Sequence, residues 1–134
     1  MSTHVSGTFE VTVNPDPPYD TAPGATLGRL VITKQFHGEL EASSRVEMLS
    51  ARSAMQGSAG YVALERVSGK LQGRPGTFVL QHSGTMTRGK ASLTVSVVPD
   101  SGTDELSGLA GTMTIDIVEG KHFYGFDYTL DEGE

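Results

Sequence analysis

Hydrophobic and polar residues alternate along most of the chain with a period of two. Between Thr3 and Val13, the residues Val5, Phe9 and Val11 share one face with Val13, and most of the intervening positions are polar. Side chains of a β-strand point alternately to its two faces, so this pattern is typical of a strand with one buried face. Comparable patterns predict strands over residues 40–48, 90–99, 112–118 and 122–130. Residues 27–36 also predict a strand, but its register is ambiguous because Leu30, Val31 and Ile32 are consecutive.

The central stretch, residues 60–89, reads as two long strands of one hairpin. We place its turn at Arg74–Pro75, because proline fixes φ and is excluded from central strands. This turn sets Leu71 opposite Phe78. One face of the hairpin is then apolar and the other polar, so we expect the apolar face to point into the core.

Two polar residues, Glu65 and His82, interrupt the apolar face of this hairpin. They occupy diagonal positions on neighbouring strands, within reach of each other's side chains. Burying a charge without a partner is costly, so an inward Glu65 beside an inward His82 predicts a mutually satisfied pair.

Three segments do not fit the alternation. Residues 14–25 hold four of the six prolines, which predicts a long ordered loop. Residues 49–59 are small and polar and predict the end of a strand followed by a loop. Residues 131–134, DEGE, form an acidic tail.

Residues 100–111 predict a short helical turn, capped by Thr103, with Leu106 and Leu109 facing inward. The whole pattern therefore contains about eight strands and no long helix. A closed antiparallel barrel satisfies this one-sided alternation and removes exposed sheet edges, and a β-sandwich is the alternative. A chain of 134 residues, 1–134, is expected to form a single domain.

Composition excludes several classes of protein. The chain has no cysteine, which excludes disulfides, thiol chemistry and cysteine-based zinc sites. Its net charge is −6 and its Lys and Arg residues do not cluster, which argues against nucleic-acid binding. The first residues do not resemble a signal peptide and the apolar runs are too short to span a membrane, so we expect a cytoplasmic protein.

Four stretches resemble a family of small, uncharacterised bacterial proteins with an allene-oxide-cyclase-like barrel. They are FHGELEASSRVEML, GYVALERVSGKLQGRPGTFVLQHSGTM, PDSGTDELSGLAGTMTI and HFYGFDYTL, and they cover most of the chain after the proline-rich loop. The Ser-Gly-Thr…Glu-Leu…Gly-Leu…Gly run is the most specific part. The resemblance implies an eight-stranded, calycin-like barrel that is commonly oligomeric, and it implies no activity and no catalytic residue.

The candidate site consists of the polar and aromatic side chains on the predicted inner face: Tyr61, Glu65, His82, His122, Tyr124 and Tyr128. In a hollow barrel these residues would line a ligand pocket, and a Glu65 of raised pKa beside His82 could act as an acid–base pair. In a filled barrel the same pair is a structural hydrogen bond. No metal or cofactor is expected, because His82, His122 and a carboxylate show no ligand spacing.

Three functions remain open at this point. The first is a barrel that binds an apolar or amphipathic small molecule. The second is a cofactor-free isomerase or cyclase-like enzyme that uses Glu65 or His82, an expectation that rests on fold analogy. The third is a structural homo-oligomer with no ligand, which associates through outward apolar residues: Val62, Leu64, Val79 and Phe123.

Overall fold

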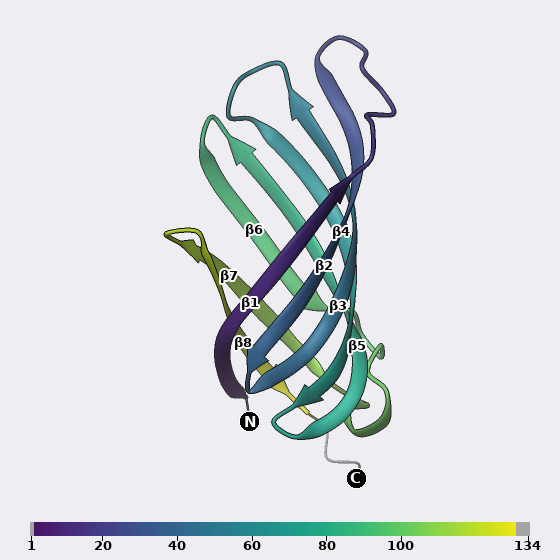
Figure 1. Cartoon of the computed structure of the whole chain (residues 1–134), viewed down its shortest axis with the longest axis vertical. Helices are drawn as coiled ribbons and strands as arrows, with labels where there is room; N and C mark the ends of the chain where they lie inside the picture. The colour runs from purple at the N-terminus through teal and green to yellow at the C-terminus, as the bar shows by residue number, and fades with distance from the viewer. Residues whose placement is uncertain (1, 131–134) are drawn as a thin grey trace.

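Eight antiparallel strands close into one barrel, in which each strand pairs with the next and β8 returns to β1 (Figure 1). The computed structural model describes residues 2–130. The strands are β1 (Thr3–Pro15), β2 (Ala25–Gly38), β3 (Leu40–Ser53), β4 (Ala59–Leu71), β5 (Arg74–Thr87), β6 (Lys90–Val97), β7 (Ala110–Val118) and β8 (Lys121–Thr129). The predicted closed barrel is confirmed, and the chain does not form the alternative sandwich. No helix in residues 2–130 is long and apolar enough to cross a membrane.

The β4–β5 hairpin turns at Gln72–Gly73, and the predicted turn at Arg74–Pro75 is wrong. Both turn residues have positive φ, 48° and 82°, which is the geometry that matches the right-handed twist of two flanking strands. Leu71 therefore pairs with Arg74 instead of Phe78, a register shift of 78 − 74 = 4 residues. Because the shift is even, the residues predicted to face the interior still do so.

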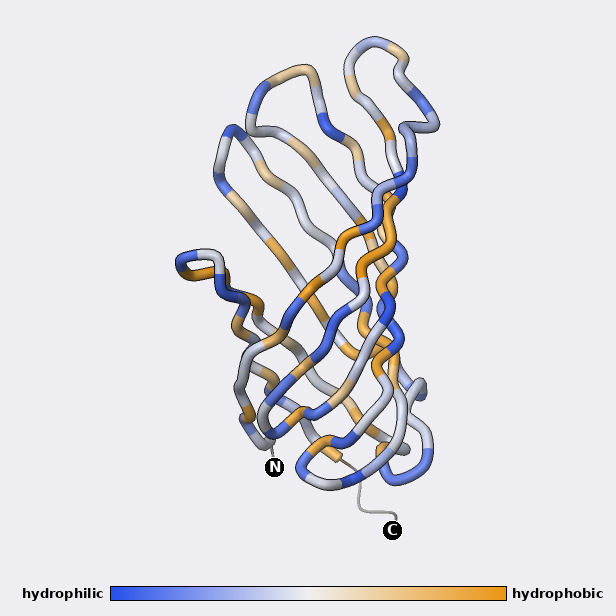
Figure 2. The backbone as a smooth tube through the Cα atoms, in the orientation of Figure 1, coloured by the Kyte–Doolittle hydropathy of each residue, from blue (hydrophilic) through white to orange (hydrophobic). Residues whose placement is uncertain are grey.

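The loops are shorter than the composition predicts. β1 continues to Pro15 and β2 begins at Ala25, and between them Asp20 forms an isolated bridge to Leu27. β3 and β4 likewise extend into the loop predicted for residues 49–59. Figure 2 shows hydrophobic and hydrophilic positions alternating along these strands. The acidic tail at residues 131–134 lies outside the described part of the chain.

The predicted helical turn is a 3-10 turn, η1 (Asp104–Leu106), and its two leucines, Leu106 and Leu109, are buried as expected. The predicted side-chain cap from Thr103 is absent. The Thr103 hydroxyl instead accepts a hydrogen bond from the backbone N–H of Thr77, 3.0 Å away. Thr103 therefore ties the η1 segment to the start of β5.

One end of the barrel is filled by side chains. The rings of Phe78 and Phe126 stack there at 5.8 Å between centroids, and both are fully buried together with Phe36. Leucines complete this part of the core: Leu40, Leu71, Leu80, Leu106 and Leu109. We call this the closed end; it carries the β2–β3 and β4–β5 turns and η1.

At the opposite end, which carries the proline-rich loop, the inner face is exposed to solvent. Along β1, burial falls from Phe9 through the half-buried Val11 to Val13, which is 51% exposed. Along β7 it falls from the buried Met113 to Ile117, which is 64% exposed. Met86 and Leu93 also point to the inner face by strand alternation and are exposed here. We call this the open end.

The seam between β6 and β7 explains why this end stays open. The two strands share a single paired position, Ser96 with Thr112. Beyond it the β7–β8 hairpin diverges from β6 (Figure 1). Leu93 on one side of the seam and Ile117 on the other therefore lack a neighbouring strand to cover them.

Candidate functional site

Glu65 lies at the centre of a buried polar network. Its side chain is wholly inaccessible to solvent, and its Oε1 lies 2.7 Å from Nε2 of His82. Ser44 Oγ donates a hydrogen bond of 2.6 Å to Oε2 of Glu65, and Lys34 Nζ donates one of 3.2 Å to Oε1. The predicted contact between Glu65 and His82 is confirmed, and Lys34 and Ser44 also hydrogen-bond Glu65. We call Lys34, Ser44, Glu65 and His82 the Glu65 network.

Four adjacent strands each contribute one inward side chain to the Glu65 network. Lys34 on β2 pairs directly with Ser44 on β3. Glu65 on β4 pairs with Val46, the next inward residue along β3, and His82 on β5 pairs with Ala63 of β4. Lys34 and Ser44 are therefore direct cross-strand neighbours, whereas Ser44 and His82 each reach Glu65 along a diagonal, within side-chain reach.

Glu65 is ionised despite its burial. Burial alone would raise the pKa of its carboxyl, but the hydrogen bond from His82, the positive charge of Lys34 and the hydrogen bond from Ser44 outweigh it and lower this pKa. The raised pKa envisaged for an acid–base pair is therefore wrong. The formal charges of Glu65 and Lys34 cancel inside the barrel.

Lys34 is held on its other side by aromatic rings. Its Nζ lies 4.9 Å from the ring centroid of Phe9 and 5.7 Å from that of Phe36, distances at which a cation is attracted to the ring face. A lysine ammonium has three donors, and Glu65 is its hydrogen-bonded acceptor. Lys34 thus keeps donor capacity on a side chain that is almost entirely buried.

Two of the predicted site residues, Tyr61 and His122, lie toward the open end. Tyr61 covers Gly84, where an added Cβ would come within 2.5 Å of Tyr61 Cε1. Burial, together with the charge of Glu65, raises the pKa of Tyr61. His122 packs its ring 5.1 Å from that of Phe9. Within residues 2–130, no three His, Asp or Glu side chains gather as a metal site.

The other two predicted residues, Tyr124 and Tyr128, belong to the closed end. The Tyr124 hydroxyl donates to the backbone carbonyl of His37, at 3.0 Å, and accepts from the N–H of Leu40, at 3.1 Å. The Tyr128 hydroxyl hydrogen-bonds the side chain of Gln72. The barrel does not bring these two tyrosines together with Glu65, and both instead secure turns between strands.

Sequence reasoning missed Lys34 and Ser44 as members of the site. The apolar run Leu30–Val31–Ile32 left the register of β2 ambiguous. Phe36 resolves it, because a large aromatic residue that faces inward places Lys34, two positions earlier, on the same face. Alternation counted back from Phe36 would have found the lysine.

The Glu65 network marks the level at which the filled core stops. Lys34 on β2 pairs with Val11 on the adjacent strand β1. The next inward pair of these two strands toward the open end is Val13 with Ile32. Lys34 is almost fully buried, whereas Val13 is 51% exposed. Solvent-accessible apolar side chains therefore begin within two residues of a buried, charged network.

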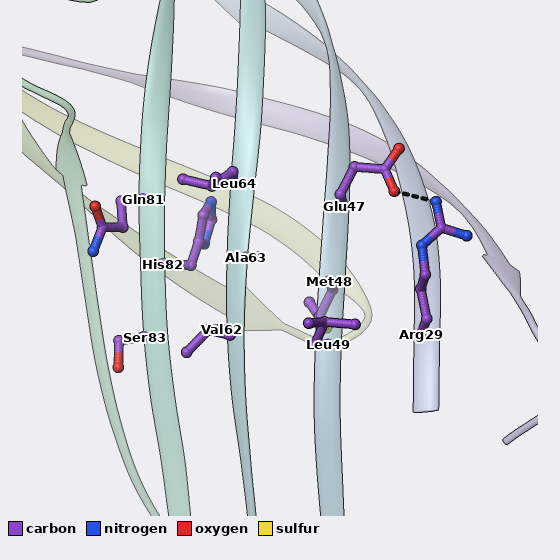
Figure 3. A pocket seen from close by; sticks show the side chains of 10 residues that line it. All are labelled: Arg29, Glu47, Met48, Leu49, Val62, Ala63, Leu64, Gln81, His82 and Ser83. Atoms are coloured by element: carbon purple, nitrogen blue, oxygen red, sulfur yellow. Dashed lines mark hydrogen bonds and ion pairs between the residues drawn. The ribbon is translucent and has the colours of Figure 1, made fainter. Parts of the chain in front are cut away.

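A hollow lies on the outer surface of the same four strands. It is a groove of about 610 Å³ whose outward-facing lining residues are Arg29, Glu47, Leu49, Val62, Leu64, Gln81 and Ser83. Figure 3 shows these side chains with the ion pair between Arg29 and Glu47 at one side. Val62 and Leu64, predicted to be outward apolar residues, are each 54% exposed. Val79 and Phe123, also predicted to be outward, are half-buried.

The fold and its interior define a closed, eight-stranded antiparallel barrel with one filled end and a buried charged network. The chain belongs to the DUF3224 family, described as "Protein of unknown function", whose profile matches residues 5–128. It is similar to a protein of unknown function from that family, from Shewanella oneidensis MR-1, with 52% identity and a TM-score of 0.92 over 98% of this chain and 99% of the other. No curated protein matches the chain.

Proposed function

We propose that the protein binds an apolar or amphipathic small molecule against the inner face of its open end. The observation that carries this proposal is the exposure of large inward apolar side chains directly above a buried polar network. A soluble chain gains nothing from leaving such surface in water, and apolar walls with a few polar groups are the usual form of a small-molecule site.

The charge of the Glu65 network selects the polar group of the ligand. Lys34 and Glu65 neutralise one another, so neither a carboxylate nor an ammonium on the ligand meets an unbalanced opposite charge. Lys34 retains donors, so a hydroxyl or carbonyl oxygen is the group that suits it. The ligand would place that oxygen near Lys34 and its apolar part against Val11, Val13 and Ile32.

The enzyme alternative has weaker support. A general acid or base must reach a substrate and titrate near the working pH. Glu65 is fully enclosed and its pKa is lowered, so it stays ionised and sealed behind His82 and Lys34. The allene-oxide-cyclase-like subtype of the barrel and a cytoplasmic location also remain proposals.

Two valines of nearly equal exposure provide the test. Val13 lies on the inner face of the open end and is 51% exposed, and Val62 lies on the outer face and is 54% exposed. The probe is N-phenyl-1-naphthylamine, an uncharged apolar dye that fluoresces when it leaves water. We expect saturable binding to the wild type, an affinity about tenfold lower for Val13→Asp, as loss of a buried valine contact implies, and no change for Val62→Asp.

Decanol and decanoate then compete for the bound dye. Decanol should displace it at least as well as decanoate, because the charges of Lys34 and Glu65 cancel. Native mass spectrometry of protein purified from its own host would show whether a natural ligand accompanies it. Dye binding that is absent, or equally weakened by both valine substitutions, would overturn the proposal.

A further inference from the structure

We propose that two copies of this chain pair about a two-fold axis through the outer face of β2–β5. This inference is independent of ligand binding, since it concerns the opposite side of the sheet. It starts from the distribution of exposed apolar side chains. Apart from Met55 in the β3–β4 loop and Val118 at the end of β7, the large ones fall into two sets. Val13, Met86, Leu93 and Ile117 lie on the inner face, and Tyr19, Leu49, Val62 and Leu64 lie on the outer surface.

The outer set forms one continuous surface. Leu49 on β3 pairs directly with Val62 on β4, and both line the groove together with Leu64. A neighbouring hollow is lined by Tyr19, Leu27 and the same two residues, Leu49 and Val62. The face therefore carries a recess and an exposed aromatic ring side by side. A two-fold interface needs both on one surface, because each copy presents the same patch to the other.

The charges on this face favour a second copy. Arg29 lies between two carboxylates, 2.6 Å from Asp16 and in contact with Glu47, while Arg45 lies 2.9 Å from Glu47. Together with Arg66 and the outward pair of Lys70 and Glu41, the face and the adjacent Asp16 carry four positive and three negative groups, a sum of +1, whereas the chain carries −6. The remaining surface therefore sums to −6 − 1 = −7, and this face is where another acidic copy approaches without repulsion.

Arg66 marks a position where the second copy would supply a negative charge. It pairs across the strands with Arg45, and like charges in directly opposite positions are unfavourable. Arg45 turns to Glu47, and within residues 2–130 Arg66 has no ion pair. A carboxylate from the facing copy would complete this charge, and the acidic groups on or beside the face are Glu41, Glu47 and Asp16.

The available area is sufficient. Four strands spaced about 4.8 Å apart, each about 43 Å long for 13 residues, offer about 800 Å² of outer face. A standard specific interface uses about 800 Å² on each partner, so pairing would engage most of the β2–β5 face.

Sedimentation equilibrium between 10 and about 200 µM tests the pairing with the same two valine variants. The wild type should have twice the chain mass of 14.2 kDa. Val62→Asp should weaken the dimer at least tenfold, and Val13→Asp should leave it unchanged. If circular dichroism shows that Val62→Asp is unfolded, Leu64→Asp replaces it, because Leu64 lies nearby and is equally exposed. Arg66→Glu should also weaken association.

A monomeric wild type throughout this range would overturn the pairing, as would equal weakening by Val62→Asp and Val13→Asp. Because the same two valine variants are used in both experiments, the results for pairing and for ligand binding can be distinguished. The outer substitution should change only the mass, the inner one only the affinity for the dye.

Discussion

Replacing Glu65 with glutamine tests whether the Glu65 network holds the barrel together. Glutamine has the shape of glutamate but no charge, so the substitution leaves the ammonium of Lys34 buried without its counter-ion. Removing one member of a buried ion pair costs about 3–5 kcal/mol. Glu65 also accepts hydrogen bonds from Ser44 and His82, and a glutamine oxygen cannot serve all three donors.

Urea unfolding followed by far-ultraviolet circular dichroism is the appropriate measurement, because the chain contains no tryptophan. A loss of about 4 kcal/mol lowers the midpoint by about 2 M urea when the slope is about 2 kcal/mol/M. The double variant Lys34→Met/Glu65→Gln should recover much of this loss, because it removes the unpaired charge. A cost below about 1 kcal/mol for Glu65→Gln, or a double variant less stable than Glu65→Gln alone, would refute the reasoning.

The pH dependence provides a second check on the same residue. The folded-state pKa of Glu65 lies below its ordinary value of 4.5, so between these two values the unfolded chain binds more protons than the folded one. The contribution of Glu65 is thus fully present above about pH 4.5 and is lost as the pH falls through the lower, folded-state pKa. The stability difference between wild type and Glu65→Gln should therefore narrow below pH 4.5, and a constant difference would contradict the assignment.

Three further substitutions test other parts of the fold, each by thermal or urea unfolding. Tyr124→Phe should cost about 1–3 kcal/mol, because it leaves the N–H of Leu40 without its hydroxyl partner; an unchanged midpoint would show that this N–H finds another acceptor. Gly84→Ala should cost about 1–3 kcal/mol through the clash with Tyr61, and the cost should vanish when Tyr61 is alanine. His4→Ala should cost less than about 1 kcal/mol, because its 2.7 Å hydrogen bond with Asp127 is exposed; a larger loss would mean that this contact is shielded from solvent.

The inner and outer faces could be predicted from alternation even where the strand register could not. The β4–β5 turn was misplaced because Pro75 looks like a turn residue, whereas Gln72 and Gly73 adopt the two positive φ angles that the turn requires. Glutamine is not a typical residue for such a position. Face assignment survives this error because the side-chain period is two and the register shift is even.

The extent of burial could not be predicted from the same pattern. Leu93 and Ile117 alternate as cleanly as residues of the closed end, yet both are exposed. Their exposure follows from the single paired position between β6 and β7, which is a long-range feature of the barrel. Alternation states which way a side chain points and says nothing about whether another strand covers it.

The Glu65 network lies where the filled, closed end of the barrel meets the open end. An ion pair buried in a core is often no more stabilising than apolar residues of the same volume, so its presence here calls for another reason. Register is one such reason, because a slip of one residue in β2 would turn Lys34 outward and remove the counter-ion of Glu65. The other is its level, because the network ends the filled core beneath the exposed Val13 and its neighbours on the inner face. The same four residues therefore align the strands of the closed end and present polar donors at the base of the open one.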